Sequence, residues 1–160
     1  MKFIVLLFIV VFTTALMADA MSLKKAQKIN PNLTETQYKE LVTEINACVI
    51  NKVSFVDVLW EVAKKESTLN PSAIGKDSEK GIFQIRQKTW GDVKDDIGWQ
   101  TDLACKIMFT NYNQLYKAIG TDSYGNNIGQ MDSTYVKNLL LKAWNKGVNY
   151  VINELNKEGI

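Results

Sequence analysis

Apolar residues recur at steps of three or four along four segments of the chain, and this spacing predicts a mainly α-helical protein. A helix with 3.6 residues per turn places such residues on one face, which other parts of the chain must cover. The four segments are residues 33–50, 54–67, 101–120 and 133–159. We therefore expect one domain in which these helices share a single core.

Residues 1–20 have the layout of a secretory signal peptide. Lys2 gives a basic start, an apolar run extends from Phe3 to Met17, and the segment ends in Ala18-Asp19-Ala20. We predict cleavage after Ala20, which leaves one domain at 21–160 that is periplasmic or secreted. The alternative is an uncleaved membrane anchor, although the run is short for a span of about 20 apolar residues.

Two cysteines and the absence of histidine limit the chemistry of the chain. Outside the cytoplasm, Cys48 and Cys105 favour a disulfide, which contributes about 4 kcal/mol in the chain-entropy model; the alternative is two buried thiols. Without histidine there is no Ser-His-Asp site, Cys-His site or His-based zinc site. The net charge of +2 is too small to indicate a nucleic-acid partner. We expect no metal and no cofactor, and chemistry that uses carboxylates, hydroxyls, amides or lysine.

One carboxylate, Glu66, stands on the apolar side of the second helical segment. It follows Leu59 and Val62 at helical spacing, and Asn70-Pro71 then ends the helix because proline disfavours helical geometry in the residue before it. Burial and the helix C-terminal dipole both disfavour the charged carboxyl and would raise its pKa. A protonated glutamic acid can donate a proton to a glycosidic oxygen. The alternative is a hydrated glutamate at a frayed helix end, paired with a neighbouring lysine.

Three motifs follow in order: Glu66-Ser67 with Asn70-Pro71-Ser72-Ala73, then Gly81-Ile82-Phe83-Gln84-Ile85, then Ala143-Trp144-Asn145-Lys146-Gly147. In the order and spacing of these motifs the chain resembles the lytic transglycosylase family of the soluble-lytic-transglycosylase-like, goose-lysozyme-like type. The resemblance covers about residues 48 to 150. It implies a mainly α, lysozyme-like single domain with a substrate cleft.

The resemblance also implies a reaction. In this family one carboxyl protonates the leaving oxygen of the β-1,4 bond between N-acetylmuramic acid and N-acetylglucosamine in peptidoglycan. The substrate's acetamido group assists, and the muramyl 6-hydroxyl closes a 1,6-anhydro ring. Carried over to this chain, the general acid and base is Glu66. An obvious second carboxylate is not required, because substrate-assisted glycosidases are exceptions to the two-carboxylate rule.

By the same resemblance, six residues are expected to bind substrate or support the acid. Gln84 matches a family glutamine that fixes an acetamido or hydroxyl group, and Asn145 matches the late asparagine. Phe83 stands where methionine is common and would form an apolar wall, while Trp144 replaces the usual tyrosine. The expected set is Ser67, Phe83, Gln84, Tyr112, Trp144 and Asn145.

Two of these assignments have open alternatives. Tyr112 would supply the phenol that Trp144 lacks, but the favoured interpretation is an aromatic residue of the core. Ser67 would hydrogen-bond near the acid, or would bond the backbone at the helix end. Gly147 is unusual inside a helical pattern, because glycine costs about 1 kcal/mol there relative to alanine, and a close backbone approach would explain it.

Other functions remain open at this point. A hydrolytic muramidase would cleave the same bond with water, using Asp77 or Glu79 as a second carboxylate. A non-catalytic peptidoglycan-binding domain would keep the fold without turnover. A small secreted domain with this cysteine pair also resembles transglycosylases that accompany secretion, conjugation or pilus systems. The expected partners are therefore peptidoglycan glycan strands and such an apparatus, with no nucleic acid, and we expect a monomer.

Overall fold

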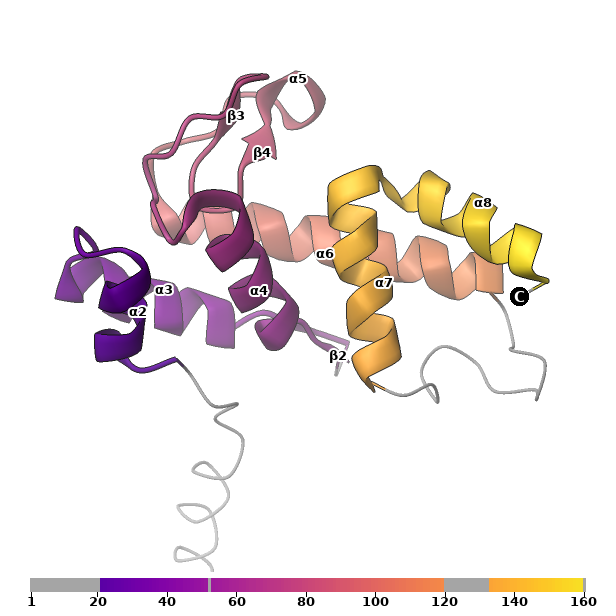
Figure 1. The fold of residues 1–160 in the computed structure, drawn as a ribbon, viewed down its shortest axis with the longest axis horizontal. Helices are drawn as coiled ribbons and strands as arrows, with labels where there is room; N and C mark the ends of the chain where they lie inside the picture. The colour runs from indigo at the N-terminus through magenta and orange to yellow at the C-terminus, as the bar shows by residue number, and fades with distance from the viewer. Residues whose placement is uncertain (1–20, 52, 120–132, 160) are drawn as a thin grey trace, which may run out of the picture.

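The structure, a computed structural model, describes residues 21–51, 53–119 and 133–159, so the predicted signal peptide lies outside the described residues. Within these ranges the domain is mainly α-helical, as predicted, with two small antiparallel hairpins (Figure 1). The helices are α2 (Leu23–Ile29), α3 (Glu35–Asn46), α4 (Val56–Ser67), α5 (Gln87–Trp90), α6 (Ile97–Ile119), α7 (Ser133–Lys146) and α8 (Val148–Glu158). The strands are β1 (Val49–Ile50), β2 (Val53–Ser54), β3 (Glu79–Lys80) and β4 (Ile85–Arg86).

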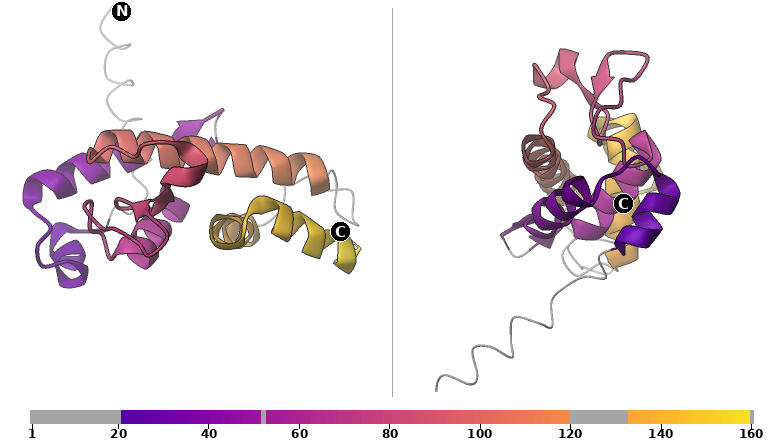
Figure 2. Two further views of the ribbon diagram at one scale, coloured as in Figure 1. Left: turned by 90° about the horizontal axis from the view of Figure 1, so that it is seen from above. Right: turned by 90° about the vertical axis from the view of Figure 1, so that its left-hand side faces the viewer.

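The long helix α6 is the element against which the other helices are arranged. It packs against α3, α7 and α8, while α4 packs against α3 and α7. Figure 2 shows α6 running along most of the domain, with α3 near its beginning and α8 near its end. Because α6 contacts α3 from the early part of the chain and α7 and α8 from the late part, it joins these two parts into one domain. No helix among the described residues has the length and apolar character that crossing a membrane requires.

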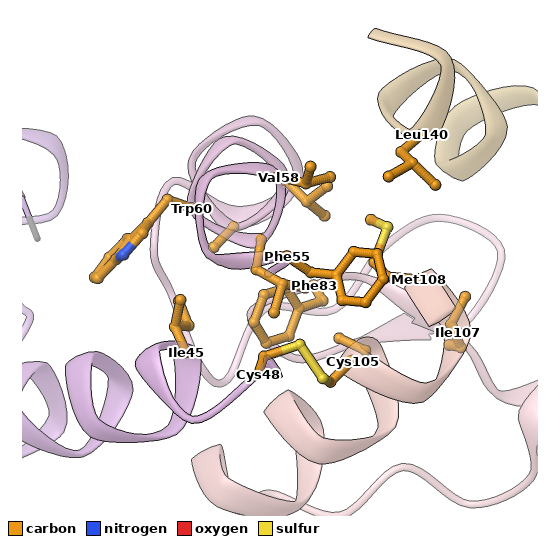
Figure 3. Close-up of a cluster of buried hydrophobic side chains, with 14 of the residues drawn as sticks. Ile45, Cys48, Phe55, Val58, Trp60, Phe83, Cys105, Ile107, Met108 and Leu140 are labelled. Carbon is orange, nitrogen blue, oxygen red and sulfur yellow. A yellow bond between two sulfur atoms is a disulfide. The ribbon is translucent and has the colours of Figure 1, made fainter. Parts of the chain in front are cut away.

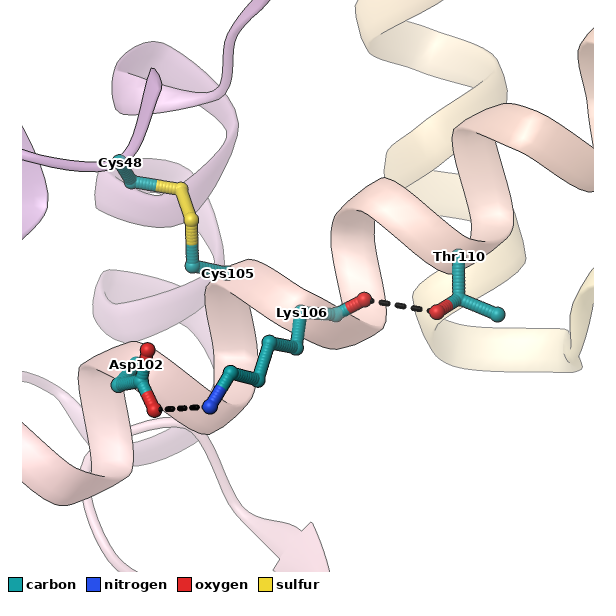
Figure 4. The surroundings of a disulfide bond; sticks show 5 residues. All are labelled: Cys48, Asp102, Cys105, Lys106 and Thr110. Atoms are coloured by element: carbon teal, nitrogen blue, oxygen red, sulfur yellow. Dashed lines mark hydrogen bonds and ion pairs between the residues drawn. A yellow bond between two sulfur atoms is a disulfide. The ribbon is translucent and has the colours of Figure 1, made fainter. Parts of the chain in front are cut away.

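The core lies where α3, α4 and α6 meet (Figure 3). Phe55, Phe83 and Met108 are fully buried there. The predicted disulfide is present beside them: Cys48 and Cys105 are bonded, with their Cα atoms 5.8 Å apart (Figure 4). The bridge therefore ties the end of α3 to the middle of α6 at the edge of the apolar cluster.

The last helical segment differs from its prediction. The apolar pattern of residues 133–159 suggests one helix, but the structure has two, α7 and α8, which are separated at Gly147. Gly147 has φ +88°, a backbone conformation that residues with a side chain rarely adopt. A Cβ atom placed on it would meet nothing within 4 Å. The prediction that another backbone segment approaches Gly147 closely is therefore wrong. The glycine is needed because its backbone conformation forms the turn between α7 and α8.

Candidate active site

An open cleft of about 850 Å³ lies over α6. One wall comes from the β3–β4 hairpin and α5, and the opposite wall comes from the junction of α7 and α8. Figure 1 shows these two groups of elements on either side of the middle of α6. The residues that line the cleft include Glu66, Glu79, Gln84, Trp90, Thr110, Asn111, Gln114, Trp144, Asn145 and Tyr150.

Glu66 stands in the last turn of α4 and is half-buried at the cleft. Burial raises the pKa of this carboxyl, because a poorly hydrated group favours its neutral form. The adjacent Lys65 acts against this rise, and the negative charge of Glu79 adds to it. At a given pH this carboxyl is therefore protonated more often than an ordinary exposed glutamate.

The chain turns sharply after Glu66. Thr68 and Leu69 both have left-handed backbone angles, with φ +53° and +62°. The Leu69 amide still donates to the carbonyl of Ala63, which closes the end of the helix. The helix thus ends at Ser67, a few residues before Asn70-Pro71, where the sequence predicted its end. The left-handed turn at Thr68 and Leu69 was not predicted.

Ser67 is buried and does not line the cleft. Its hydroxyl donates to the carbonyl of Ile82 at 2.7 Å and accepts a bond from the Asn70 amide at 3.1 Å. The alternative in which this hydroxyl bonds the backbone therefore describes the structure. Through the bond to Ile82, Ser67 attaches the helix that carries Glu66 to the segment that carries Gln84.

Gln84 lines the cleft, as the prediction requires. Its backbone is left-handed, with φ +48°, and its side-chain amide donates to the carbonyls of Ala73 at 3.1 Å and Gly81 at 2.9 Å. Both donor hydrogens thus hold the loop in place. The remaining amide oxygen lies beside Gly75, 2.6 Å from the position that a Cβ atom on that glycine would take.

Trp144 and Asn145 line the opposite wall, at the end of α7. The Asn145 amide donates to the carbonyl of Leu141 at 3.0 Å, and the residue remains exposed. The structure therefore brings Glu66, Gln84, Trp144 and Asn145 to one cleft, although almost eighty positions of the sequence separate the first from the last.

Two residues of the expected set, Phe83 and Tyr112, do not line the cleft, and for Tyr112 the alternative of a core aromatic residue describes the structure. Phe83 is 0% exposed and belongs to the core, so it cannot form a wall against substrate. Tyr112 packs edge-on against Phe55, with ring centroids 5.9 Å apart, and does not line the cleft. Both side chains pack against the apolar cluster instead. Tyr112 is on α6, and another face of this helix is turned to the cleft. On α6 that face carries Asn111 and Gln114.

Glu79 is a second carboxylate in the cleft. Hydrogen bonds from its own backbone amide and that of Asp77, together with Arg86, hold the pKa of Glu79 below its ordinary value. Its Oε1 lies 3.3 Å from Nε of Arg86, and its Oε2 accepts from the Asp77 amide at 2.9 Å. One cleft therefore contains a carboxyl whose pKa is raised and a carboxyl whose pKa is lowered, a pairing that is known from sites with separate acid and base residues.

Gln100 is a residue that the sequence analysis missed. It is fully buried; its Oε1 accepts from the Ile82 amide at 2.8 Å, and its Nε2 donates to the carbonyls of Pro71 and Lys94. A Cβ atom on Gly81 would lie 2.3 Å from that Oε1, so the glycine is required there. The sequence signal was a polar residue just before the expected helix start at Thr101, but α6 begins earlier and buries it.

A mainly helical domain with a partly desolvated glutamic acid in an open polar cleft has the layout of lysozyme-like, glycan-cleaving enzymes. The model of the transglycosylase SLT domain family matches residues 52–159, and the chain belongs to this family. Family membership supports a lytic transglycosylase that acts on peptidoglycan, outside the cytoplasm. Searches of curated proteins and of solved structures give no match.

Proposed function

We propose that the protein cleaves the β-1,4 bond between N-acetylmuramic acid and N-acetylglucosamine, forms a 1,6-anhydromuramyl product, and uses Glu66 as general acid and base. The observation that carries this proposal is the position of Glu66. It lies in the cleft, and burial raises the pKa of its carboxyl above the ordinary value. An ordinary exposed glutamate would be ionised at neutral pH and would have no proton to donate.

The proposed reaction needs no second carboxylate and consumes no water. Protonated Glu66 donates to the glycosidic oxygen while the bond to the anomeric carbon breaks and the substrate's acetamido oxygen bonds to that carbon. The Glu66 carboxylate then removes the proton of the muramyl 6-hydroxyl, whose oxygen displaces the acetamido oxygen. Glu66 ends protonated, so the same residue serves as acid and then as base.

The remaining predicted residues have separate parts in this proposal. The free amide oxygen of Gln84 would accept a bond from an acetamido N–H or a hydroxyl of the sugar. Trp144 and Asn145 would bind the strand from the opposite wall. Ser67 and Gln100 would not touch substrate; they would keep the helix end of Glu66 and the Gln84 segment at a fixed separation.

Digestion of purified sacculi, followed by mass analysis of the soluble products, tests the proposal. The wild-type protein is expected to release anhydro products that are one water lighter than those of a lysozyme. Glu66→Gln keeps the shape of the side chain and removes the acid, so turnover should fall roughly a thousandfold, within the range for general acid catalysis. Equal solubilisation by the two proteins would refute the assignment of Glu66, and binding of sacculi without turnover by either would indicate a wall-binding domain.

A hydrolytic muramidase is the second candidate, because Glu79 supplies an ionised carboxylate in the same cleft. In that reaction water would replace the 6-hydroxyl as acceptor. The same digestion separates the candidates, since hydrolysis adds one water to each product and transglycosylation does not. Glu79→Gln is the matched variant: it should abolish hydrolysis but should leave a Glu66-dependent transglycosylase active.

The cleaved signal peptide and the association with a secretion, conjugation or pilus apparatus stay predictions. The first is tested by the N-terminal sequence of the exported protein, which should begin at Met21.

A further inference from the structure

Two exposed aromatic residues lie in the cleft and have no place in the reaction described above. Trp90 is 43% exposed at the end of α5, and Tyr150 is 47% exposed in α8. Both line the cleft, from opposite walls. Large aromatic side chains left open to solvent in a concave site usually mark a binding surface, because their burial by a ligand is favourable.

The ring of Tyr150 is held in place by its own helix and by α7. Its hydroxyl donates to Oε1 of Glu154 at 2.8 Å, one turn further along α8. The other oxygen of Glu154 forms an ion pair with Lys142 of α7. The phenol is thus satisfied within the protein, and the ring needs no hydrogen bond from a ligand to keep its position.

Polar amides on neighbouring elements accompany the rings. Asn111 and Gln114 reach the cleft from α6, and Asn149 precedes Tyr150. Carboxamides donate and accept hydrogen bonds, while aromatic faces cover C–H surfaces. This combination suits an N-acetylated sugar, whose ring has apolar faces and a rim of hydroxyl and acetamido groups.

We propose that Trp90 and Tyr150 form two sugar-binding platforms at the opposite rims of the cleft, and that Glu154 acts as a positioning residue for Tyr150. The ligand class is an N-acetylated glycan strand, bound through the faces of its sugar rings. The assignment of these platforms to a peptidoglycan strand rests on the proposed function. The binding contact itself does not depend on which bond is cleaved.

Binding is best measured in the Glu66→Gln protein, because loss of turnover keeps the ligand intact. The probe is the hexamer of N-acetylglucosamine, titrated by isothermal calorimetry into this parent and into Trp90→Ala and Tyr150→Ala versions. Each ring removal is expected to weaken binding about tenfold, as loss of one aromatic contact would. Tyr116→Ala is the matched control: it removes an aromatic that is 41% exposed on α6 but lies outside the cleft, and it should leave affinity unchanged.

The positioning role of Glu154 needs a separate comparison. Glu154→Ala should weaken hexamer binding about two- to threefold when Tyr150 is present and should have no further effect in the Tyr150→Ala background. A Glu154 effect of equal size in both backgrounds would show that it acts on the fold alone, and would overturn the positioning role.

Kinetics with soluble glycan strands then use proteins that retain Glu66. The Trp90→Ala and Tyr150→Ala proteins should show a raised KM and a nearly unchanged kcat, because the contact is made equally before and during the reaction. Unchanged hexamer affinity and unchanged KM in both variants, or no hexamer binding by the parent, would overturn the platforms while leaving the role of Glu66 intact. Conversely, weakened binding in both variants together with turnover that does not need Glu66 would refute only the proposed acid.

Discussion

The surroundings of the disulfide and the loop that follows Glu66 are built in different ways. Cys48 and Cys105 adjoin a cluster of buried apolar side chains, most of which come from helices α3, α4 and α6. Between Thr68 and Gln84 the structure is irregular, and left-handed φ angles occur at Thr68, Leu69, Ser78 and Gln84. Non-glycine residues in such conformations cost energy and tend to gather at functional sites. The first region stabilises the domain, and the second shapes the cleft.

The two regions are also held together by different forces. Burial of apolar surface and a covalent bridge hold the disulfide region. The loop is held by hydrogen bonds from buried polar side chains. Ser67 donates to the Ile82 carbonyl, and Gln100 hydrogen-bonds to the backbone of Ile82, Pro71 and Lys94. Backbone groups that leave regular secondary structure need other partners, and these side chains supply them. The shape of the cleft therefore depends on a few hydrogen bonds.

The largest expected effect on stability comes from the disulfide region. Replacing both Cys48 and Cys105 by alanine should lower the free energy of unfolding by about 2–4 kcal/mol, because the unfolded chain regains the freedom of the opened loop. Urea denaturation of the oxidised wild-type protein and the double variant measures this difference. The activity of the folded variant should be close to that of the wild type. An unchanged urea midpoint would contradict the division of the molecule into these two regions.

A smaller effect, of opposite sign, is expected in the loop. Thr68→Gly should raise the free energy of unfolding by up to about 1 kcal/mol, since glycine adopts φ +53° without the strain that a β-branched residue carries. Thr43→Gly, at an exposed position with ordinary helical geometry in α3, is the control and should be destabilising. If Thr68→Gly is more destabilising than Thr43→Gly, backbone strain at Thr68 is not a feature that separates the loop from the helices.

The carboxyl of Glu66 gives a prediction about the sign of a pH effect on stability. Burial raises its pKa in the folded protein, with Lys65 opposing and Glu79 adding to the rise. Its favourable contribution is therefore fully present below the unfolded-state pKa and is lost as pH rises through the folded-state pKa. Glu66→Gln should consequently have a higher Tm than the wild type at neutral pH, and the difference should shrink toward acid pH. A constant difference in Tm across pH would show that titration of Glu66 is not the cause.

The smallest expected effect is a shift in the pH dependence of activity. A general acid must be protonated, so the rate should fall as pH rises through the pKa of Glu66. Glu79→Gln removes a negative charge that raises this pKa, and it should move the fall to lower pH. Lys65→Gln removes a positive charge that lowers it, and it should move the fall to higher pH. Shifts of kcat/KM in the same direction for both variants would contradict this account.

Sequence reasoning succeeded where the physical signal is local. Helical spacing identified α3, α4 and α6, and it placed Glu66 at a helix end that the structure confirms. The capped start of α3 at Thr34 follows the same local rules, with its hydroxyl accepting from the Gln37 amide. A single pair of cysteines allows one bridge within the chain, so Cys48 and Cys105 needed no further choice.

It failed where a residue's role depends on distant segments. Phe83 and Tyr112 are suitable cleft residues by type, but the faces on which they lie are turned to the core. Gln100 shows no motif, and its importance appears only when Ile82 and Pro71 come within hydrogen-bonding distance. None of these facts follows from a pattern of neighbouring residues.

The sequence by itself determined the helical class, the family, the disulfide pair and the place of Glu66 at the end of α4, because periodicity, motif spacing and residue chemistry are properties of the chain. The tertiary structure alone decided which side chains reach the cleft, how far Glu66 is desolvated, and which aromatic rings stay open to a ligand. Burial and hydrogen-bond partners arise when α4, α6, α7 and α8 pack together, and packing brings together residues that no local rule relates.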